Sequence, residues 1–398
     1  MFQSSGDICG ESNWTDAAQK KSVPHAVLSL SHWDQFESDL DLMQSIGVDT
    51  YRISIEWSHI EPQQGQYNHL ILKRYQKLID ACIERQIKPM ITLYHFNEPF
   101  WFTQLGGFEK EENIRYFMSY CMHVFPLFSP KVFLWCTINE PAIQAFSSYL
   151  WGQFPPHKHN LQLTVTVLKN LLKAHVNVYR ALKSLQPLNA VMIGIAHNVL
   201  RFKSLYPYDL FTRTLSSHLT TITNELVIQF FTTGLFDYDA PLLSAHVHYQ
   251  DLRAPAANDF IGLNFYANPI IGPNTINGYG ATCFSGQEMG DMFLPIDPHG
   301  FSNAIDEIAL LHKPIYITET GIADRSDILR QKFLRQYVDI IKLKIDQHFD
   351  IRGCYFWTFR DNYEWNEGHD KRLFGFYDAE GHPRESVEVL KQIIRDPH

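Results

Sequence analysis

The sequence predicts an α/β protein with the architecture of a (β/α)8 TIM barrel, whose first strand is shortened at the N-terminus. Three observations predict this fold. Strand-like and helix-like runs alternate along the chain, short apolar runs are closed by turn residues, and polar residues gather just after several of those runs. In a parallel barrel the carboxyl ends of the strands meet at one face, where reactive side chains lie.

Seven apolar runs have the length and β-rich composition of buried strands: 51–55, 88–93, 132–138, 190–195, 260–264, 314–318 and 354–358. Stretches with a helical period of apolar residues lie before, between and after them: 35–46, 69–85, 163–182, 301–311, 328–349 and 386–394. A repeated strand-then-helix order implies parallel strands joined by right-handed crossovers.

An eightfold barrel needs one more strand before residue 35, and only residues 1–4 have a strand-like character there. We therefore expect the chain to begin inside that strand. A short or open seam between the first and last barrel strands, with unpaired backbone groups along it, would follow. No linker, repeat or low-complexity stretch divides residues 1–398, so we expect one barrel domain.

The composition argues against several classes of function. The 398 residues carry a net charge of −9 and no basic run, whereas nucleic-acid binding needs clustered Lys and Arg. No apolar stretch reaches the roughly 18 residues of a membrane span, and the first residues lack the pattern of a secretory signal. The six cysteines form no CxxC pair, so we expect a reduced, cytoplasmic setting.

Two glutamates at predicted strand ends are the strongest indication that the protein has a catalytic function. Glu140 stands in Trp-Cys-Thr-Ile-Asn-Glu-Pro (135–141), and Glu319 stands in Tyr-Ile-Thr-Glu-Thr-Gly (316–321). A carboxylate beside a core costs free energy, so each needs a reason. Two carboxylates around one reacting bond are what acetal cleavage requires. Either glutamate alone could be a solvated loop residue. The polar and aromatic residues at the other predicted strand ends favour the catalytic interpretation.

Other predicted strand ends also carry polar or aromatic residues. Arg52 lies within a strand and, as a cation pointing into a barrel, needs an anionic partner. Asn264 and Tyr266 share a face because they are two residues apart. Each such residue is more often structural than catalytic when taken singly, but their gathering at one barrel mouth by chance is rare. The other polar or aromatic residues at predicted strand ends are His95, Asn97, Asn139, Trp357 and the segment 360–365.

These segments resemble glycoside hydrolase family 1, the β-glucosidase and β-galactosidase family. Residues 137–141 are similar to its acid/base motif and residues 317–321 to its nucleophile motif. Five further segments match in the same order, so the resemblance covers nearly the whole chain: 51–57, 92–95, 106–108, 260–266 and 357–368.

The resemblance implies a retaining β-glycosidase that hydrolyses terminal, unphosphorylated β-D-glycosides (glucosides, galactosides or fucosides) through a covalent glycosyl-enzyme intermediate. The expected substrate is a small-molecule β-glycoside or oligosaccharide, and no cofactor or metal is implied. Carried over residue by residue, Glu140 would be the general acid/base, Glu319 the nucleophile, and Arg52 and Tyr266 its supports. The substrate-binding residues would be Gln3, His95, Asn139, Asn264, Trp357 (as the aromatic platform), Glu364 and Trp365.

Electrostatics supports the two glutamate roles. The carboxyl groups of a retaining pair lie about 5–5.5 Å apart. Both cannot comfortably be ionised at that separation, so we expect Glu140 to hold a proton while Glu319, beside Arg52, stays anionic. Glu364 would repel a phosphate group, so we expect an unphosphorylated glycone.

The chain departs from the family pattern at three places. Thr320 stands where asparagine is usual, Phe96 stands where tryptophan is frequent, and only two residues precede Gln3. The start affects Gln3 most, because the first strand of the family runs ahead of this glutamine.

Three alternatives remain open at this point. A catalytically impaired sugar-binding barrel protein usually loses one of the two glutamates, and this chain keeps both. A metal-dependent hydrolase would need histidine ligands, but the His-x-His pairs at 157–159 and 246–248 follow no convincing strand with acidic partners, which favours solvated loop histidines. Transglycosylation would use the same site as hydrolysis and differ only in the acceptor.

Overall fold

The computed structural model describes residues 11–24, 32–185, 191–272, 287–292, 294–368 and 372–396. Its strands are β1 (Thr50–Ser54), β2 (Lys88–Tyr94), β3 (Leu134–Asn139), β4 (Met192–Asn198), β5 (Lys203–Ser204), β6 (Leu235–Ala240), β7 (Ala245–Gln250), β8 (Phe260–Asn264), β9 (Ile270–Ile271), β10 (Ile315–Thr320) and β11 (Ile351–Phe356). Its α-helices are α2 (Asn13–Gln19), α3 (His32–Ser45), α4 (Trp57–Ile60), α5 (His69–Glu84), α6 (Phe100–Gln104), α7 (Ile114–Phe128), α8 (Pro141–Ala145), α9 (Leu161–Ser184), α10 (Leu210–Thr220), α11 (Leu226–Thr233), α12 (Pro298–Ala309), α13 (Ile328–Asp346) and α14 (Ser386–Arg395).

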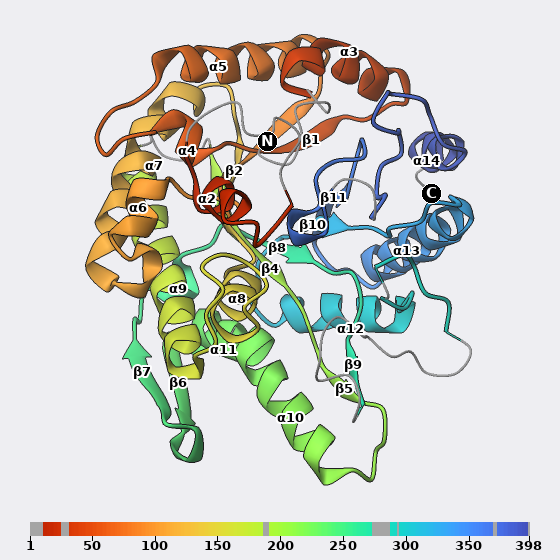
Figure 1. The fold of residues 1–398 in the computed structure, drawn as a ribbon. Helices are drawn as coiled ribbons and strands as arrows, with labels where there is room; N and C mark the ends of the chain where they lie inside the picture. Colours follow the sequence, from red (N-terminus) through yellow and green to blue (C-terminus); the bar gives the residue numbers. More distant parts are fainter. Residues whose placement is uncertain are drawn as a thin grey trace.

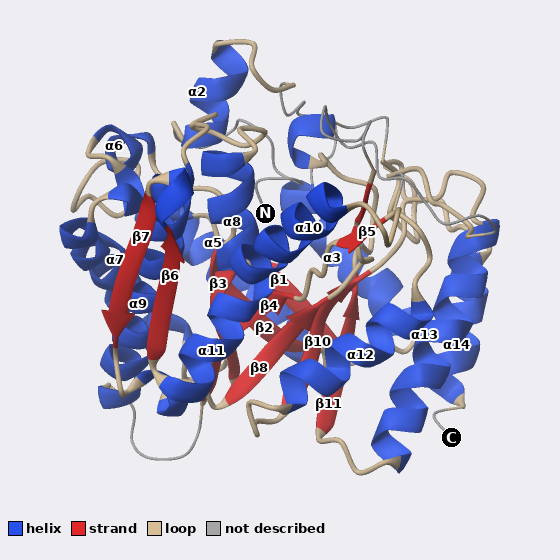
Figure 2. Cartoon of the chain, turned by 90° about the horizontal axis from the view of Figure 1, so that it is seen from below, coloured by secondary structure: helices blue, strands red, loops and turns tan. Residues whose placement is uncertain are grey.

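Seven of these strands form one parallel sheet in the order β1-β2-β3-β4-β8-β10-β11. The long helices surround this sheet, which curves around a central axis (Figures 1 and 2). The predicted (β/α)8 barrel is confirmed, and each of the seven predicted strands overlaps one of these strands. The largest difference at a carboxyl end is in β4, which continues three residues beyond the predicted end, to Asn198.

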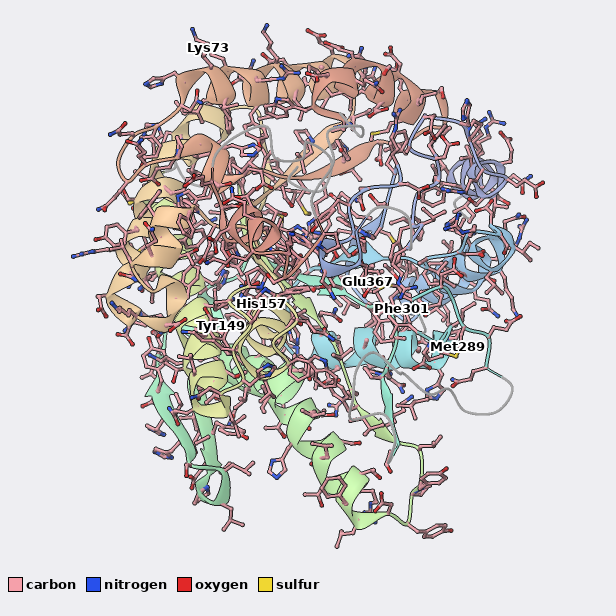
Figure 3. All side chains as sticks on the ribbon, viewed as in Figure 1. Lys73, Tyr149, His157, Met289, Phe301 and Glu367 are labelled. Atoms are coloured by element: carbon pink, nitrogen blue, oxygen red, sulfur yellow. The ribbon has the colours of Figure 1, made fainter. Side chains whose placement is uncertain are left out.

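Helix α5 illustrates how the sequence of a helix fits it to cover the barrel. The side chain of Asn68 caps the first turn by accepting hydrogen bonds from the backbone N–H groups of Leu70 and Ile71. Tyr75 and Leu78 belong to the buried face of the helix, whereas Lys73 points away from the protein (Figure 3). Burial of that apolar stripe, more than helix propensity, holds such a helix on the sheet.

The barrel interior is packed closely where β8 passes between β4 and β10. A Cβ atom on Gly262 would lie 2.7 Å from Oγ1 of Thr318, closer than van der Waals contact allows. Glycine is therefore needed for the close approach of these strands. The Thr318 hydroxyl uses this space to donate a hydrogen bond of 2.6 Å to Oδ1 of Asn264.

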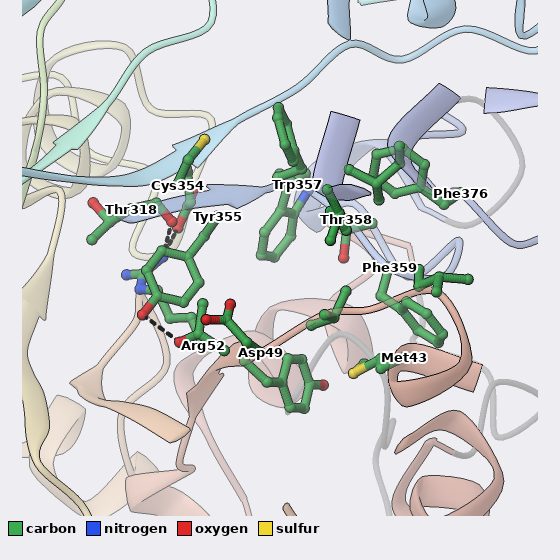
Figure 4. Close-up of a pocket in the computed structure, with 18 of the residues that line it drawn as sticks. Met43, Asp49, Arg52, Thr318, Cys354, Tyr355, Trp357, Thr358, Phe359 and Phe376 are labelled. Atoms are coloured by element: carbon green, nitrogen blue, oxygen red, sulfur yellow. Dashed lines mark hydrogen bonds and ion pairs between the residues drawn. The ribbon is translucent and has the colours of Figure 1, made fainter. Parts of the chain in front are cut away.

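The edges of β1 and β11 face each other across a seam. Among the described residues no ladder of backbone hydrogen bonds joins the two strands, and side chains bridge them instead, as Oγ1 of Thr50 lies 2.8 Å from the hydroxyl of Tyr355. A cavity of about 640 Å³ opens along this seam and reaches Arg52 and Trp357 (Figure 4). The predicted first strand at residues 1–4, which includes Gln3, lies outside the described residues.

The interpretation of 246–248 as a loop is wrong. These residues lie in β7, which pairs with β6 in an antiparallel hairpin outside the barrel. The register places Asp239 opposite His246 and Asp237 opposite His248, with His–Asp distances of 3.3 and 3.1 Å. The hairpin alternates apolar and polar residues, and this strand signal was missed.

None of the helices in the described part of the chain has both the length and the apolar character to cross a membrane.

Candidate active site

Glu140 occupies a strained position directly after β3. Its backbone is left-handed, with φ of 46°, and Pro141 opens helix α8 immediately afterwards. The backbone N–H of Glu140 donates a hydrogen bond of 2.8 Å to the carbonyl of Ala196 on β4. Only 5 % of Glu140 is exposed. Uncommon backbone geometry of this kind persists when the surroundings fix it, and it is frequent at functional sites.

Glu319 is held by two donors at the mouth of the barrel. Nη1 of Arg52, from β1, donates to Oε1 of Glu319, and the hydroxyl of Tyr266 donates to Oε2 at 2.9 Å. The side chains of Arg52 and Glu319 are 6 % and 7 % exposed, so the pair is almost entirely withdrawn from water. The anionic partner expected for Arg52 is therefore Glu319.

Asn139 and Asn264 connect the two glutamates. Oδ1 of Asn139 accepts hydrogen bonds from Nη2 of Arg52 at 2.6 Å and from Nδ2 of Asn264 at 3.2 Å. Nδ2 of Asn264 also donates to Oε1 of Glu140 at 2.7 Å. A continuous chain of contacts thus runs from Glu319 through Arg52, Asn139 and Asn264 to Glu140. The structure brings together five of the residues that the sequence predicted for one site.

Burial and, after it, the negative charge of Glu319 raise the pKa of Glu140 to about 8. The amides of Asn264 and Asn198 and the charge of Arg52 act in the opposite direction. The raised pKa keeps Glu140 protonated at neutral pH. A carboxylic acid that holds its proton at pH 7 can act as a general acid.

The sequence analysis missed Asn198 as a member of the site. Its Nδ2 donates to Oε1 of Glu140 at 3.1 Å, on the same oxygen that Asn264 contacts. Asn198 and Asn264 are partners in the register of β4 and β8, which explains why both amides reach one carboxyl group. The prediction ended the β4 strand at residue 195, so the polar residue at the true strand end was not considered.

His95 lies next to the nucleophile candidate. Its Nε2 is 3.0 Å from Nδ2 of Asn139 and 4.0 Å from Oε1 of Glu319, and its Nδ1 is 2.7 Å from Oγ of Ser54. Burial and the charge of Arg52 hold the pKa of His95 well below its ordinary value, so the ring is neutral. Ser54 is a second contact that the sequence analysis did not single out.

Aromatic residues and one further acid complete this region. Nε1 of Trp357 donates to Oε2 of Glu364 at 3.2 Å. Burial, with a smaller contribution from the charge of Glu319, raises the pKa of Glu364 to about 8, against the lowering effect of the Trp357 hydrogen bond. Trp365 packs against Trp14 and His95, with ring centroids 4.8 and 5.5 Å apart. Only 7 % of Trp365 is exposed, so it forms a wall behind His95.

Both internal departures from the family pattern have structural roles. Phe96 has a left-handed backbone, its carbonyl accepts hydrogen bonds from Asn13 and Trp14, and its ring packs on Trp365. The hydroxyl of Thr320 donates to the carbonyl of Phe265 at 2.8 Å, which ties β10 to the end of β8.

One group within the described ranges has the side chains for a metal ion: Asp378, Glu380 and His382, in a largely exposed turn. Nδ1 of His382 lies 2.9 Å from Oδ2 of Asp378. None of the three belongs to the chain of contacts around Glu140 and Glu319.

Residues 7–396 match the model of glycosyl hydrolase family 1. The chain belongs to this family. It is accordingly an O-glycosyl hydrolase, and the resemblance inferred from the motifs is confirmed.

Relatives agree with the assignment. A β-galactosidase of Pyrococcus woesei is 24 % identical over 92 % of this chain and 86 % of its own length. A 6-phospho-β-galactosidase of Staphylococcus aureus is 26 % identical over 91 % of this chain and 87 % of its own length. The structure of a β-glycosidase from Pyrococcus horikoshii superimposes with a TM-score of 0.85 at 29 % identity, covering 99 % of this chain and 92 % of that one.

Proposed function

We propose that this family 1 hydrolase is a retaining β-glycosidase that removes terminal, unphosphorylated β-D-glycosyl residues through a covalent intermediate on Glu319. One observation carries the proposal. Glu140, which keeps its proton, and Glu319, which is bound to Arg52, are connected through Asn139 and Asn264. Two carboxyl groups in different protonation states are what a retaining mechanism needs.

In the first step a carboxylate oxygen of Glu319 attacks the anomeric carbon, and the bond from that carbon to the leaving-group oxygen breaks. Glu140 transfers its proton to the departing oxygen. Arg52 and Tyr266 hold the attacking carboxylate in place. Because Oε1 of Glu140 accepts N–H bonds from both Asn198 and Asn264, Oε2 is left as the oxygen that carries the transferable proton.

In the second step the glycosyl ester on Glu319 is uncharged, so the electrostatic contribution that raised the pKa of Glu140 is removed. Glu140, now a stronger acid, is ionised and takes a proton from an incoming water molecule. The water oxygen bonds to the anomeric carbon, and the bonding electrons return to Glu319 as its carboxylate. An alcohol in place of water would give transglycosylation at the same site.

Glu364 supports a glycone without phosphate. With a pKa of about 8, Glu364 is mainly neutral at pH 7 and becomes an anion at higher pH, so in neither form does it supply the positive charge that a phosphate group needs. The relative that is named for a 6-phosphogalactoside makes this a necessary test. We expect 4-nitrophenyl β-glucoside or β-galactoside to have a higher kcat/KM than the matching 6-phosphate. A higher value for the phosphorylated substrate would reject this part of the proposal.

Azide rescue of two alanine variants tests the assignment of the glutamates. Glu319→Ala should lose turnover and regain it with azide, giving an α-glycosyl azide because only one displacement occurs. Glu140→Ala, the matched control, should use azide to give a β-glycosyl azide, because the intermediate on Glu319 still forms. NMR identifies the two anomers. Full activity of Glu319→Ala without azide, or a β-glycosyl azide from it, would refute the proposal.

A further inference from the structure

Arg52 fixes the orientation of a short hydrogen-bond network. A guanidinium group has only donors, so Oδ1 of Asn139, at 2.6 Å from Nη2 of Arg52, is the acceptor of that bond. Nδ2 of Asn264 donates to the same oxygen at 3.2 Å. The guanidinium, which cannot accept, therefore determines which end of the Asn139 amide is the oxygen, and the contact with Asn264 agrees with that orientation.

The orientation of Asn139 identifies the tautomer of His95 in this structure. Nδ2 of Asn139 has only hydrogens to offer, so Nε2 of His95, 3.0 Å away, must accept. A neutral imidazole carries one N–H, and with Nε2 as acceptor this N–H is at Nδ1. Nδ1 lies 2.7 Å from Oγ of Ser54, and the serine hydroxyl is the acceptor of its hydrogen bond.

We propose that Ser54 is a positioning residue that holds His95 in the Nδ1–H tautomer, so that His95 presents an acceptor, not an N–H, to Asn139 and Glu319. The register of β1 and β2 pairs Ser54 with Thr92 and so brings the hydroxyl beside the residue that follows β2. The sequence segment 51–57 thus supplies two functional side chains, Arg52 and Ser54.

The other tautomer would disturb the nucleophile candidate. A hydrogen on Nε2 would oppose the N–H of Asn139, and Nε2 itself lies 4.0 Å from Oε1 of Glu319, the oxygen that Arg52 holds. An extra donor there would stabilise the ground-state carboxylate and compete for the attacking oxygen. Ser54 prevents this by giving Nδ1–H a partly buried acceptor.

The tautomer is measured by long-range ¹H–¹⁵N NMR on the full chain labelled with ¹⁵N-histidine, with His95→Gln used only to identify the signals. We expect a protonated-type shift for Nδ1 and an unprotonated-type shift for Nε2. In Ser54→Ala the two shifts should move toward each other or exchange, whereas Ser54→Thr, which keeps the hydroxyl, should retain the wild-type pattern. Ser58→Ala, a matched loss of a buried hydroxyl that contacts Asn97, should leave the His95 signals unchanged.

A protonated Nε2 in the wild type, or an unchanged pattern in Ser54→Ala, would overturn the proposal. If Ser54→Ala does not fold, Ser54→Cys provides the same test with a weak acceptor of similar volume. The kinetic consequence rests on the proposed function: kcat/KM of Ser54→Ala on an aryl β-glycoside should fall about 5- to 10-fold, the loss of one hydrogen bond. If no β-glycoside is cleaved by the wild type, the proposed function fails while the NMR still decides the tautomer.

Discussion

Arg52 donates a hydrogen bond of 2.6 Å from Nη2 to Oδ1 of Asn139, while Nη1 of the same guanidinium donates to Glu319. The planar fork of arginine is rigid, so it sets the nucleophile candidate at a fixed position relative to the residue that precedes Glu140. Glu140 directly follows β3 and Glu319 lies in β10, and these two strands are not neighbours in the sheet. Arg52 from β1 and Asn264 from β8 therefore connect them.

The first prediction concerns the pH dependence of kcat/KM. Glu140 must be protonated to act as an acid, and its pKa of about 8 places the loss of activity with rising pH near that value. A β-glycoside with a poor leaving group should show this basic limb. A 2,4-dinitrophenyl β-glycoside, which needs no acid assistance, should show a much weaker one. Glu364→Gln is the control because Glu364 titrates in the same range, and in this variant the limb should persist.

The second prediction concerns stability. The folded-state pKa of Glu140 lies above its unfolded value near 4.5, so the native state holds the proton more tightly and stability falls as pH rises from about 4.5 to about 8. Glu140→Gln removes this penalty and keeps an oxygen for Asn198 and Asn264. Urea unfolding should show the variant to be more stable than the wild type by a few kcal/mol at pH 8, with the difference vanishing near pH 4. A difference that does not depend on pH would contradict the assignment.

Asn198 gives a third prediction. Its amide stabilises the ionised form of Glu140, so Asn198→Leu should raise the pKa of that glutamate and move the basic limb of kcat/KM upward, by up to about one unit. Asn303→Leu makes the same chemical change at an exposed position of α12 and should leave the limb in place. A downward shift in Asn198→Leu would show that its amide does not act on Glu140 in this way.

The sequence predicted the barrel well because its signals are local. Alternating strand and helix periods, and motifs such as 137–141 and 317–321, need no knowledge of distant contacts. The two glutamates and Arg52 could be singled out because a charge beside an apolar run is costly and demands a partner. The anionic partner expected for Arg52 was then found in Glu319.

What the sequence did not reveal depends on register and tertiary contact. Asn198 contacts Glu140 because β4 and β8 align Asn198 with Asn264, and no local pattern encodes that pairing. Ser54 was indistinguishable from any polar residue on a half-buried strand until β1 and β2 were set side by side. The β6–β7 hairpin was missed because its strands are only six residues long and lie outside the strand-then-helix alternation on which the prediction rested.

The last prediction separates the stability of the Arg52–Glu319 pair from its chemistry. Arg52→Met leaves a buried carboxylate without its cation and should cost roughly 3–5 kcal/mol in unfolding free energy at pH 7. Adding Glu319→Gln to this variant removes the uncompensated charge, so the double variant should recover a large part of that loss. Urea unfolding with unchanged m-values measures both effects. Turnover should stay abolished in the double variant, because the nucleophile is gone even where stability returns. Equal stabilities of Arg52→Met and the double variant would show that the two side chains do not interact as an ion pair, and the coupling between β1 and β10 would then need another cause.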